Sequence, residues 1–151
     1  MGDADRGGRV MATFLLKTEP EAFSFDDLIR AGRSAWDGVS NGAALAFLRT
    51  MRAGDEAFIY HTGDEKAVVG LARVVAAPYE DPARPGRTPT GEPKFAVVDL
   101  EAVRSAVTPL TLAAVKADAR FALFPLVTQA RLSVMPVPRG LDAVIRALTR
   151  V

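Results

Sequence analysis

The sequence predicts an α+β domain built round a mixed, partly closed β-sheet. Segments typical of strands and helices follow one another irregularly, unlike the regular alternation of a doubly wound parallel sheet. Two expected helices come early, between residues 24 and 52, and the expected strands cluster in the middle of the chain. A chain of 151 residues, 49% of them hydrophobic, can bury one core without disulfides or a structural metal. We therefore expect one domain.

Local patterns predict the elements of the first half of the chain. Residues 12–17, ATFLLK, form a β-prone run. Ser24 is a good cap for a short amphipathic helix that ends at Gly32. A brief strand over residues 34–36 and an Ala- and Leu-rich helix over 42–51 follow it.

Two β segments, EAFIYH at 56–61 and AVVGLARVVAA at 67–77, open the middle of the chain. Residues 78–93 contain five prolines, which predicts a loop. A strand beginning at residue 94 and a short helix capped by Thr111 are expected next.

The end of the chain predicts one more strand and one more helix. In RLSVMPV, residues 131–137, alternation would place Arg131 and Ser133 on one strand face. Leu141, Val144, Ile145 and Leu148 have the spacing of a helix packed on the core.

Composition excludes several kinds of chemistry. There are no cysteines and one histidine, His61, so thiol catalysis, disulfides and a His-rich metal centre are not expected, and we predict no cofactor. A net charge of +1 does not provide the strong basic field that grips long stretches of duplex. We expect residues 1–11, Gly- and charge-rich, to be a flexible extension. No apolar run is long enough to span a membrane, which predicts a cytoplasmic protein, or a nuclear one in a eukaryote.

The stretch WDGVSNG allows two interpretations. Its second half has the G-x-S-x-G pattern of a nucleophile elbow centred on Ser40, and Asp55 and His61 follow in the order of a hydrolase triad. Alternatively, Trp36, Asp37 and Asn41 could offer one aromatic face and two polar groups to a planar heterocycle. A buried tryptophan followed by an Asx turn remains the plain structural alternative.

Several motifs together resemble the EVE domain family. FLLKTEP, WDGVSN, FIYHTG, VVGLARVV followed by PYEDP, FAVVDL and RLSVMPV occur in the order and spacing of that family, from Ala12 to about Leu148. The resemblance implies a PUA-like fold, a small mixed β-barrel flanked by short helices, over residues 12–151. It also implies that the domain recognises nucleic acid.

The implied ligand is a modified base, such as 5-methylcytosine or 5-hydroxymethylcytosine in DNA, or a modified RNA base. The domain would be non-enzymatic, without a membrane partner, and a monomer is favoured. The family motifs imply that the following residues bind the base: Lys17, Glu19, Trp36, Asp37, Asn41, Tyr60, His61, Thr62, Arg131 and Ser133.

Two departures from the family pattern bear on binding. Ser40 stands where the family usually has arginine, so the residue that completes the hydrolase pattern looks like a substitution within a binding motif. Thr62 replaces a serine and keeps the hydroxyl. Arg84 and Arg87 in the Pro-rich loop are candidate phosphate contacts. A small-ester hydrolase using Ser40 and His61, and a protein-interaction module using the Pro-rich loop, remain alternatives.

Overall fold

The structure is a computed structural model that describes residues 10–151. Its strands are β1 (Thr13–Thr18), β2 (Arg33–Trp36), β3 (Glu56–His61), β4 (Ala67–Glu80), β5 (Ala96–Thr111) and β6 (Val134–Pro136). Its helices are α1 (Phe25–Ala31), α2 (Gly42–Thr50), α3 (Leu112–Ala117), a 3-10 turn η1 (Ala119–Phe121), α4 (Pro125–Thr128) and α5 (Arg139–Thr149). The expected α+β class is confirmed.

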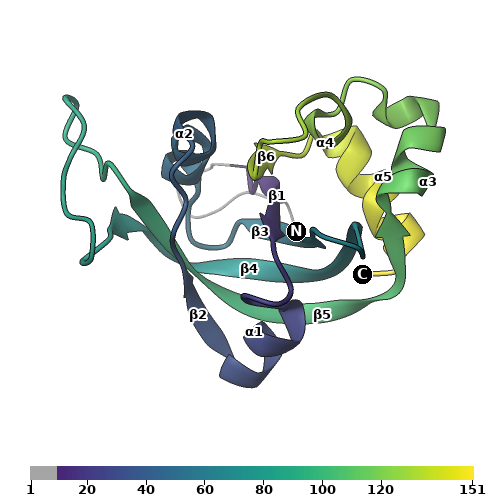
Figure 1. Cartoon of the computed structure of the whole chain (residues 1–151), viewed down its shortest axis with the longest axis horizontal. Helices are drawn as coiled ribbons and strands as arrows, with labels where there is room; N and C mark the ends of the chain where they lie inside the picture. Colours follow the sequence, from purple (N-terminus) through teal and green to yellow (C-terminus); the bar gives the residue numbers. More distant parts are fainter. Residues whose placement is uncertain (1–9) are drawn as a thin grey trace.

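One sheet organises the domain. Its six strands lie in the order β2-β5-β4-β3-β1-β6 (Figure 1). β1 pairs with β3 in parallel and every other pair is antiparallel, so the sheet is mixed, as expected. β2 and β6 are the two edges of this sheet, which is therefore not closed into the barrel that the family resemblance implies.

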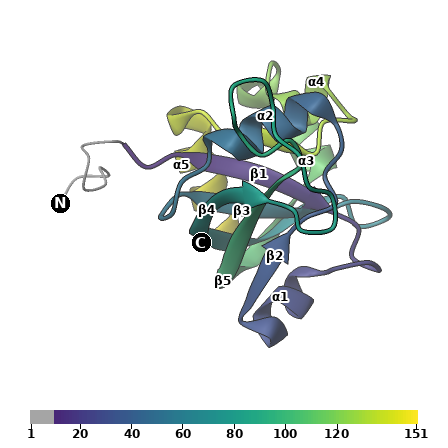
Figure 2. The same cartoon turned by 90° about the vertical axis from the view of Figure 1, so that its left-hand side faces the viewer.

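The centre of the sheet is covered on both faces. Residues Ala57 to His61 of β3 are buried in succession, whereas a strand with one solvated face would alternate. Leu15, Leu16, Phe58 and Ile59 have no exposed surface. Helix α5 packs against β5 and α2 against β6, while α1 lies beside β2 at the other end of the molecule (Figures 1 and 2). The core thus lies round β1 and β3.

Local capping explains where the short helices begin. Ser24 Oγ accepts a hydrogen bond from Asp27 N, and the Asp27 carboxylate accepts one from Ser24 N, which makes a capping box. Helix α1 ends at Gly32, whose φ of +77° suits glycine. Thr111 caps α3 as expected.

Several expected boundaries are wrong. β6 contains only three residues, so Arg131 and Ser133 precede it and do not share a strand face. The alternation also fails, because Val134 and Met135 are both buried. β4 runs through Pro78 to Glu80, so the Pro-rich loop begins later than expected. On α5, Leu148 is 40% exposed and Thr149 is buried instead.

The prediction of a flexible extension over residues 1–11 falls largely outside the part of the chain that the structure describes. Residues 1–9 of the expected extension lie outside the described part of the chain. Met11, the last residue of that expected extension, places its side chain over Gly54. Within residues 10–151, no helix is long and apolar enough to cross a membrane.

Candidate functional site

The carboxyl ends of β1 and β3 bring four of the predicted site residues together. Parallel pairing sets Lys17 opposite Tyr60 and Thr18 opposite His61. The pairing continues one step further, because Thr62 N donates to Thr18 O at 2.9 Å. Parallel strands end at the same edge of a sheet, and polar side chains that follow them are therefore neighbours.

Lys17 connects this edge to the segment before β6. Its backbone N–H donates to Ser133 O at 2.9 Å, and its ammonium donates to Ala130 O at 2.8 Å. The same Nζ lies 5.8 Å from the centre of the Tyr60 ring. Burial lowers the pKa of Lys17 and raises the pKa of Tyr60. Arg131 is exposed and adjoins the residue that Lys17 contacts.

Glu19 lies just beyond β1 with an exposed side chain. Its backbone carbonyl accepts hydrogen bonds from Ala22 N and Phe23 N, which turns the chain towards α1. Among the described residues, Glu19 forms no ion pair with Lys17, whose ammonium donates to Ala130 O instead.

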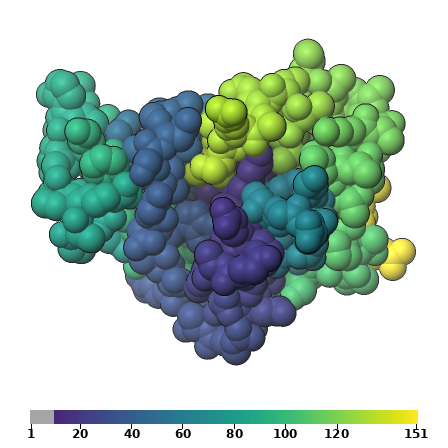
Figure 3. Space-filling model, viewed as in Figure 1, coloured from purple at the N-terminus to yellow at the C-terminus, as the bar shows by residue number. Residues whose placement is uncertain are grey.

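A pocket of about 320 Å³ opens beside Trp36. It is lined by Thr18, Phe23, Ser34, Ala35, Trp36 and Asp37. Figure 3 shows this face hollowed between the blue segment that leads from β2 to α2 and the purple segment that follows β1. Its volume lies at the small end of the range for ligand sites.

Two aromatic rings form the apolar part of this pocket. Trp36 is only 7% exposed, and the Phe23 ring meets it edge-on at a centroid distance of 6.1 Å and an angle of 78°. Thr18 Oγ1 donates to Phe23 O at 2.7 Å, which ties the position of Phe23 to the end of β1. Asp37 is exposed at the rim.

The loop after Trp36 is held in place at both ends. Asn41 caps α2, and its Oδ1 accepts a hydrogen bond from Ala44 N at 3.0 Å. Arg84 donates to Ser40 Oγ at 2.9 Å and to Val39 O at 3.1 Å. The amide nitrogen of Asn41 is the part of that side chain still able to donate to a ligand.

Further contacts fix the two arginines of the Pro-rich loop. The Arg84 guanidinium lies 4.2 Å from the centre of the Phe95 ring and pairs with Asp81 at 3.3 Å. Arg87 pairs with Glu80 at 3.1 Å and donates to Gly91 O. Much of the hydrogen-bonding capacity of both guanidinium groups is therefore used within the protein.

His61 is buried, and both nitrogens of its ring have partners. Phe25 N donates to Nε2 at 3.0 Å, and Nδ1 lies 2.7 Å from Glu65 Oε1. Ser40 Oγ, in contrast, bonds to Arg84. The described part of the chain contains no hydrogen bond between Ser40 and His61, so the geometry of a hydrolase dyad is not assembled.

Asp55, the third member of the expected triad, has a structural environment. It is fully buried, and its carboxylate accepts hydrogen bonds from Ala12 N at 3.0 Å and from Arg52 N at 2.9 Å. These contacts tie the start of β1 to the turn before β3. The Asp55 carboxylate therefore has a structural role, because its hydrogen bonds hold two backbone segments together.

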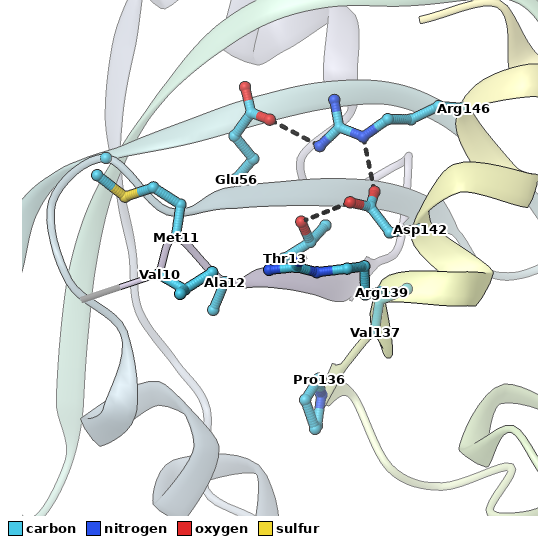
Figure 4. A pocket seen from close by; sticks show the side chains of 11 residues that line it. Val10, Met11, Ala12, Thr13, Glu56, Pro136, Val137, Arg139, Asp142 and Arg146 are labelled. Atoms are coloured by element: carbon cyan, nitrogen blue, oxygen red, sulfur yellow. Dashed lines mark hydrogen bonds and ion pairs between the residues drawn. The ribbon is translucent and has the colours of Figure 1, made fainter. Parts of the chain in front are cut away.

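A larger pocket of about 720 Å³ lies at the amino ends of β1 and β3 (Figure 4). Arg146 on α5 donates to Glu56 and to Asp142 at 2.6 Å each, and Thr13 Oγ1 donates to Asp142 at 3.2 Å. None of the predicted site residues lines it. Its charges are largely paired with one another. No group of three or more His, Asp or Glu side chains in residues 10–151 is placed to hold a metal ion.

Sequence reasoning missed Phe23 as a pocket residue, and it singled out Lys17 and Glu19 in the KTEP motif where the structure places Thr18 in the pocket wall. Phe23 directly precedes the capping Ser24, a place where an aromatic or aliphatic side chain commonly packs at the start of a helix. That signal was available. Its packing on Trp36 depends on the fold of the whole chain.

Comparison with known proteins gives concordant results. A family model described as EVE domain matches residues 12–148. Thymocyte nuclear protein 1 of Homo sapiens is 35% identical over an alignment covering 60% of this chain and 49% of that protein. The chain spans about half the length of these thymocyte nuclear protein 1 relatives from mouse, human and rat.

Solved structures also resemble the chain. Rpa0253 from Rhodopseudomonas palustris is 37% identical, with a TM-score of 0.83 over 93% of this chain and 94% of that one. Human THYN1 protein, solved in complex with 5-methylcytosine containing DNA, is 29% identical, with a TM-score of 0.82 over 93% and 98%. An ASCH protein from Zymomonas mobilis, 13% identical with a TM-score of 0.56 over 91% and 96%, shares the fold alone.

Proposed function

The chain belongs to the EVE domain family, and we propose that it is a non-enzymatic module that binds nucleic acid and recognises a modified base. The observation that carries this proposal is the pocket lined by the contacting rings of Phe23 and Trp36, with Asp37 at its rim. A human relative was solved with 5-methylcytosine containing DNA, which supports the same class of ligand here. Methylated or hydroxymethylated cytosine in DNA is the leading candidate, and a modified RNA base is the other.

The chemistry of the rim suits the polar edge of a cytosine. A carboxylate is the natural acceptor for the exocyclic amino group of cytosine, and Asp37 is the carboxylate among the residues that line this pocket. Asn41 does not line this pocket, and its amide nitrogen could donate only to a part of the ligand that extends beyond the rim. The apolar walls accept a methyl substituent. Asp37 therefore reads the amino group, and Trp36 and Phe23 provide the apolar contact.

Local positive charge can bind phosphate even though the net charge of the chain is only +1. The Lys17 ammonium donates to Ala130 O at the carboxyl edge of β1 and β3, and the exposed Arg131 is the next residue along the chain. These two cations would meet the phosphate of the bound nucleotide or its neighbour. Local positive charge of this kind makes binding salt-dependent with a shallow slope. A base held inside a duplex must first be unstacked at a cost of a few kcal/mol, so single strands bind more tightly than duplexes. A protein with this function acts in the cytoplasm, or in the nucleus of a eukaryote.

The proposal is tested by titration with short single-stranded oligonucleotides that carry unmodified, methylated or hydroxymethylated cytosine, at fixed low salt. Trp36 is the single tryptophan of the chain, so its fluorescence reports directly on the pocket. We expect saturable quenching that is stronger for a modified base. Equal weak binding of all three oligonucleotides, together with no response to modified RNA, would contradict the function.

A substitution at Asp37 tests whether the base binds in this pocket. Asp37→Asn keeps the size of the side chain and removes the acceptor charge, and we expect it to weaken binding roughly 10-fold, in line with about 1–3 kcal/mol for a base-edge contact. Glu92→Gln makes the same charge change at an exposed carboxylate in the Pro-rich loop and is the matched control. Equal losses in the two variants would indicate a general electrostatic effect instead.

A further inference from the structure

His61 occupies a buried position between three elements of the fold. It ends β3 and is 8% exposed. Its Nε2 receives the backbone N–H of Phe25, the first residue of α1. Its Nδ1 faces the carboxylate of Glu65 in the β3–β4 loop. The imidazole therefore joins the start of a helix to the end of a strand.

This geometry defines the protonation of the ring. A backbone N–H can only donate, so the Nε2 atom that accepts from Phe25 carries no proton. The carboxylate of Glu65 can only accept, so Nδ1 carries the proton and donates it. His61 is accordingly a neutral imidazole in the Nδ1–H tautomer, and neither nitrogen is free for a ligand.

The contacts of His61 lead towards the pocket. Phe25 is seated by His61 through its backbone and packs its ring on Gly70 of β4. Two residues earlier, the carbonyl of Phe23 is held by Thr18 Oγ1 at 2.7 Å. The segment between these two fixed points presents the Phe23 ring to Trp36. Phe23 N also donates to Glu19 O, and Ser24 belongs to the capping box of α1. Loss of the His61 contact therefore removes the hydrogen bond that joins the start of α1 to the end of β3 and leaves these local contacts in place.

We propose that His61 is a positioning residue that seats the start of α1 with its unprotonated Nε2, so that Phe23 packs edge-on against Trp36 and forms the apolar wall of the pocket together with it. This role differs from the direct base contact that the sequence motif implies for His61. Its effect on ligand affinity rests on the proposed function, whereas its effect on the pocket of the free protein does not.

Two substitutions separate positioning from direct contact. Glutamine places its side-chain oxygen near the location of Nε2, so His61→Gln can still accept from Phe25 N. His61→Asn is too short and cannot. We expect His61→Asn to weaken binding of a methylcytosine oligonucleotide roughly 2- to 10-fold, the equivalent of one hydrogen bond. We expect His61→Gln to stay within about twofold of the parent. Equal losses in both variants would overturn the proposal.

Glu65→Gln is a matched control for the other nitrogen. Its side-chain oxygen still accepts from Nδ1, and the Glu65 side chain is 45% exposed. This variant should keep the tautomer and bind nearly as the parent does. A loss as large as that of His61→Asn would show that the carboxylate charge acts on the ligand directly, which contradicts the role assigned to His61.

The free protein tests the proposal without any ligand. Nitrogen-15 NMR of the labelled ring should show an unprotonated Nε2 and a protonated Nδ1, and His61→Asn should shift Trp36 emission to the red as Phe23 loosens. A protonated Nε2, or emission unchanged in His61→Asn, would refute the positioning role. Failure of every oligonucleotide to bind the parent would refute the proposed function while these two measurements still decide the role of His61.

On addition of saturating oligonucleotide, the tautomer should stay the same. Transfer of the Nε2 hydrogen bond from Phe25 to the ligand would show direct contact and overturn the proposal.

Discussion

Gly70 on β4 lies directly beneath the ring of Phe25, so Gly70→Ala should destabilise the protein through a steric clash. A Cβ at Gly70 would lie 2.4, 2.5 and 2.7 Å from three carbons of that ring. Ordinary contact begins at 3.4 Å, so the ring would have to retreat by 3.4 − 2.4 = 1.0 Å. Phe25 is 3% exposed, and its backbone is held by His61, so the ring has little room to move.

Forcing extra volume into a packed core costs about 1–3 kcal/mol. For a domain of this size, 1 kcal/mol shifts the unfolding temperature by about 2–4 °C, so we expect a fall of roughly 2–12 °C. Thermal and urea unfolding followed by circular dichroism measure it. The urea m-value should stay unchanged, because the unfolded state exposes the same surface.

Gly140→Ala is the matched control. Gly140 lies in the first turn of α5, has an ordinary φ, and a Cβ there meets nothing within 4 Å. Alanine in place of glycine in a helix stabilises by about 0.5–1 kcal/mol, so this variant should unfold slightly later than the parent. If Gly70→Ala unfolded at the temperature of the parent, the ring of Phe25 could not lie on Gly70, and the seating of α1 described above would be wrong.

Three further predictions concern ion pairs and one tyrosine. Arg84→Ala should cost about 1–3 kcal/mol in urea unfolding, because its charged hydrogen bonds to the loop after Trp36 are lost; no change in the unfolding midpoint would contradict those bonds. Arg146→Ala should cost a similar roughly 1–3 kcal/mol, with Arg146→Lys intermediate, because two carboxylates lose their shared partner. Burial, followed by the hydrogen bond and charge of Asp99, raises the pKa of Tyr79 to about 12. Since an unfolded tyrosine has a pKa of about 10, the stability due to Tyr79 is complete below about pH 10 and is lost as the pH rises through about 12. Asp99→Asn should lower this pKa in an NMR titration of labelled tyrosine rings, and an unchanged value would exclude the contact.

Local chemistry predicted the starts of the short helices well. A capping serine or threonine acts on amide groups two or three residues away, so Ser24 and Thr111 could be recognised without knowledge of the fold. Asn41 is also a preferred capping residue, but it was considered only as a ligand group, and its role as the cap of α2 was not predicted. In the structure this side chain caps α2.

Features set by pairing between distant strands were less predictable. The alternation of RLSVMPV indicated a longer strand, but only three residues find a partner on β1, and Arg131 remains outside the sheet. The segments that carry Lys17, Tyr60 and Ser133 are neighbours in the structure, but none of these three residues lines the pocket beside Trp36. Phe23 belongs to no quoted motif, and its contact with Trp36 exists only once α1 is folded back against β2.

Within residues 10–151, β2 has one edge without a strand partner, and the pocket lies along that strand. Exposed strand edges invite another chain to extend the sheet, and natural proteins discourage this with short strands and charge. β2 has four residues and begins with the exposed Arg33. A copy that added a strand here would cover Ser34 and Ala35 in the pocket wall. The outer edge of β2 must therefore stay unpaired for two reasons. Pairing with another chain would start aggregation, and it would also block the access of a ligand to the pocket.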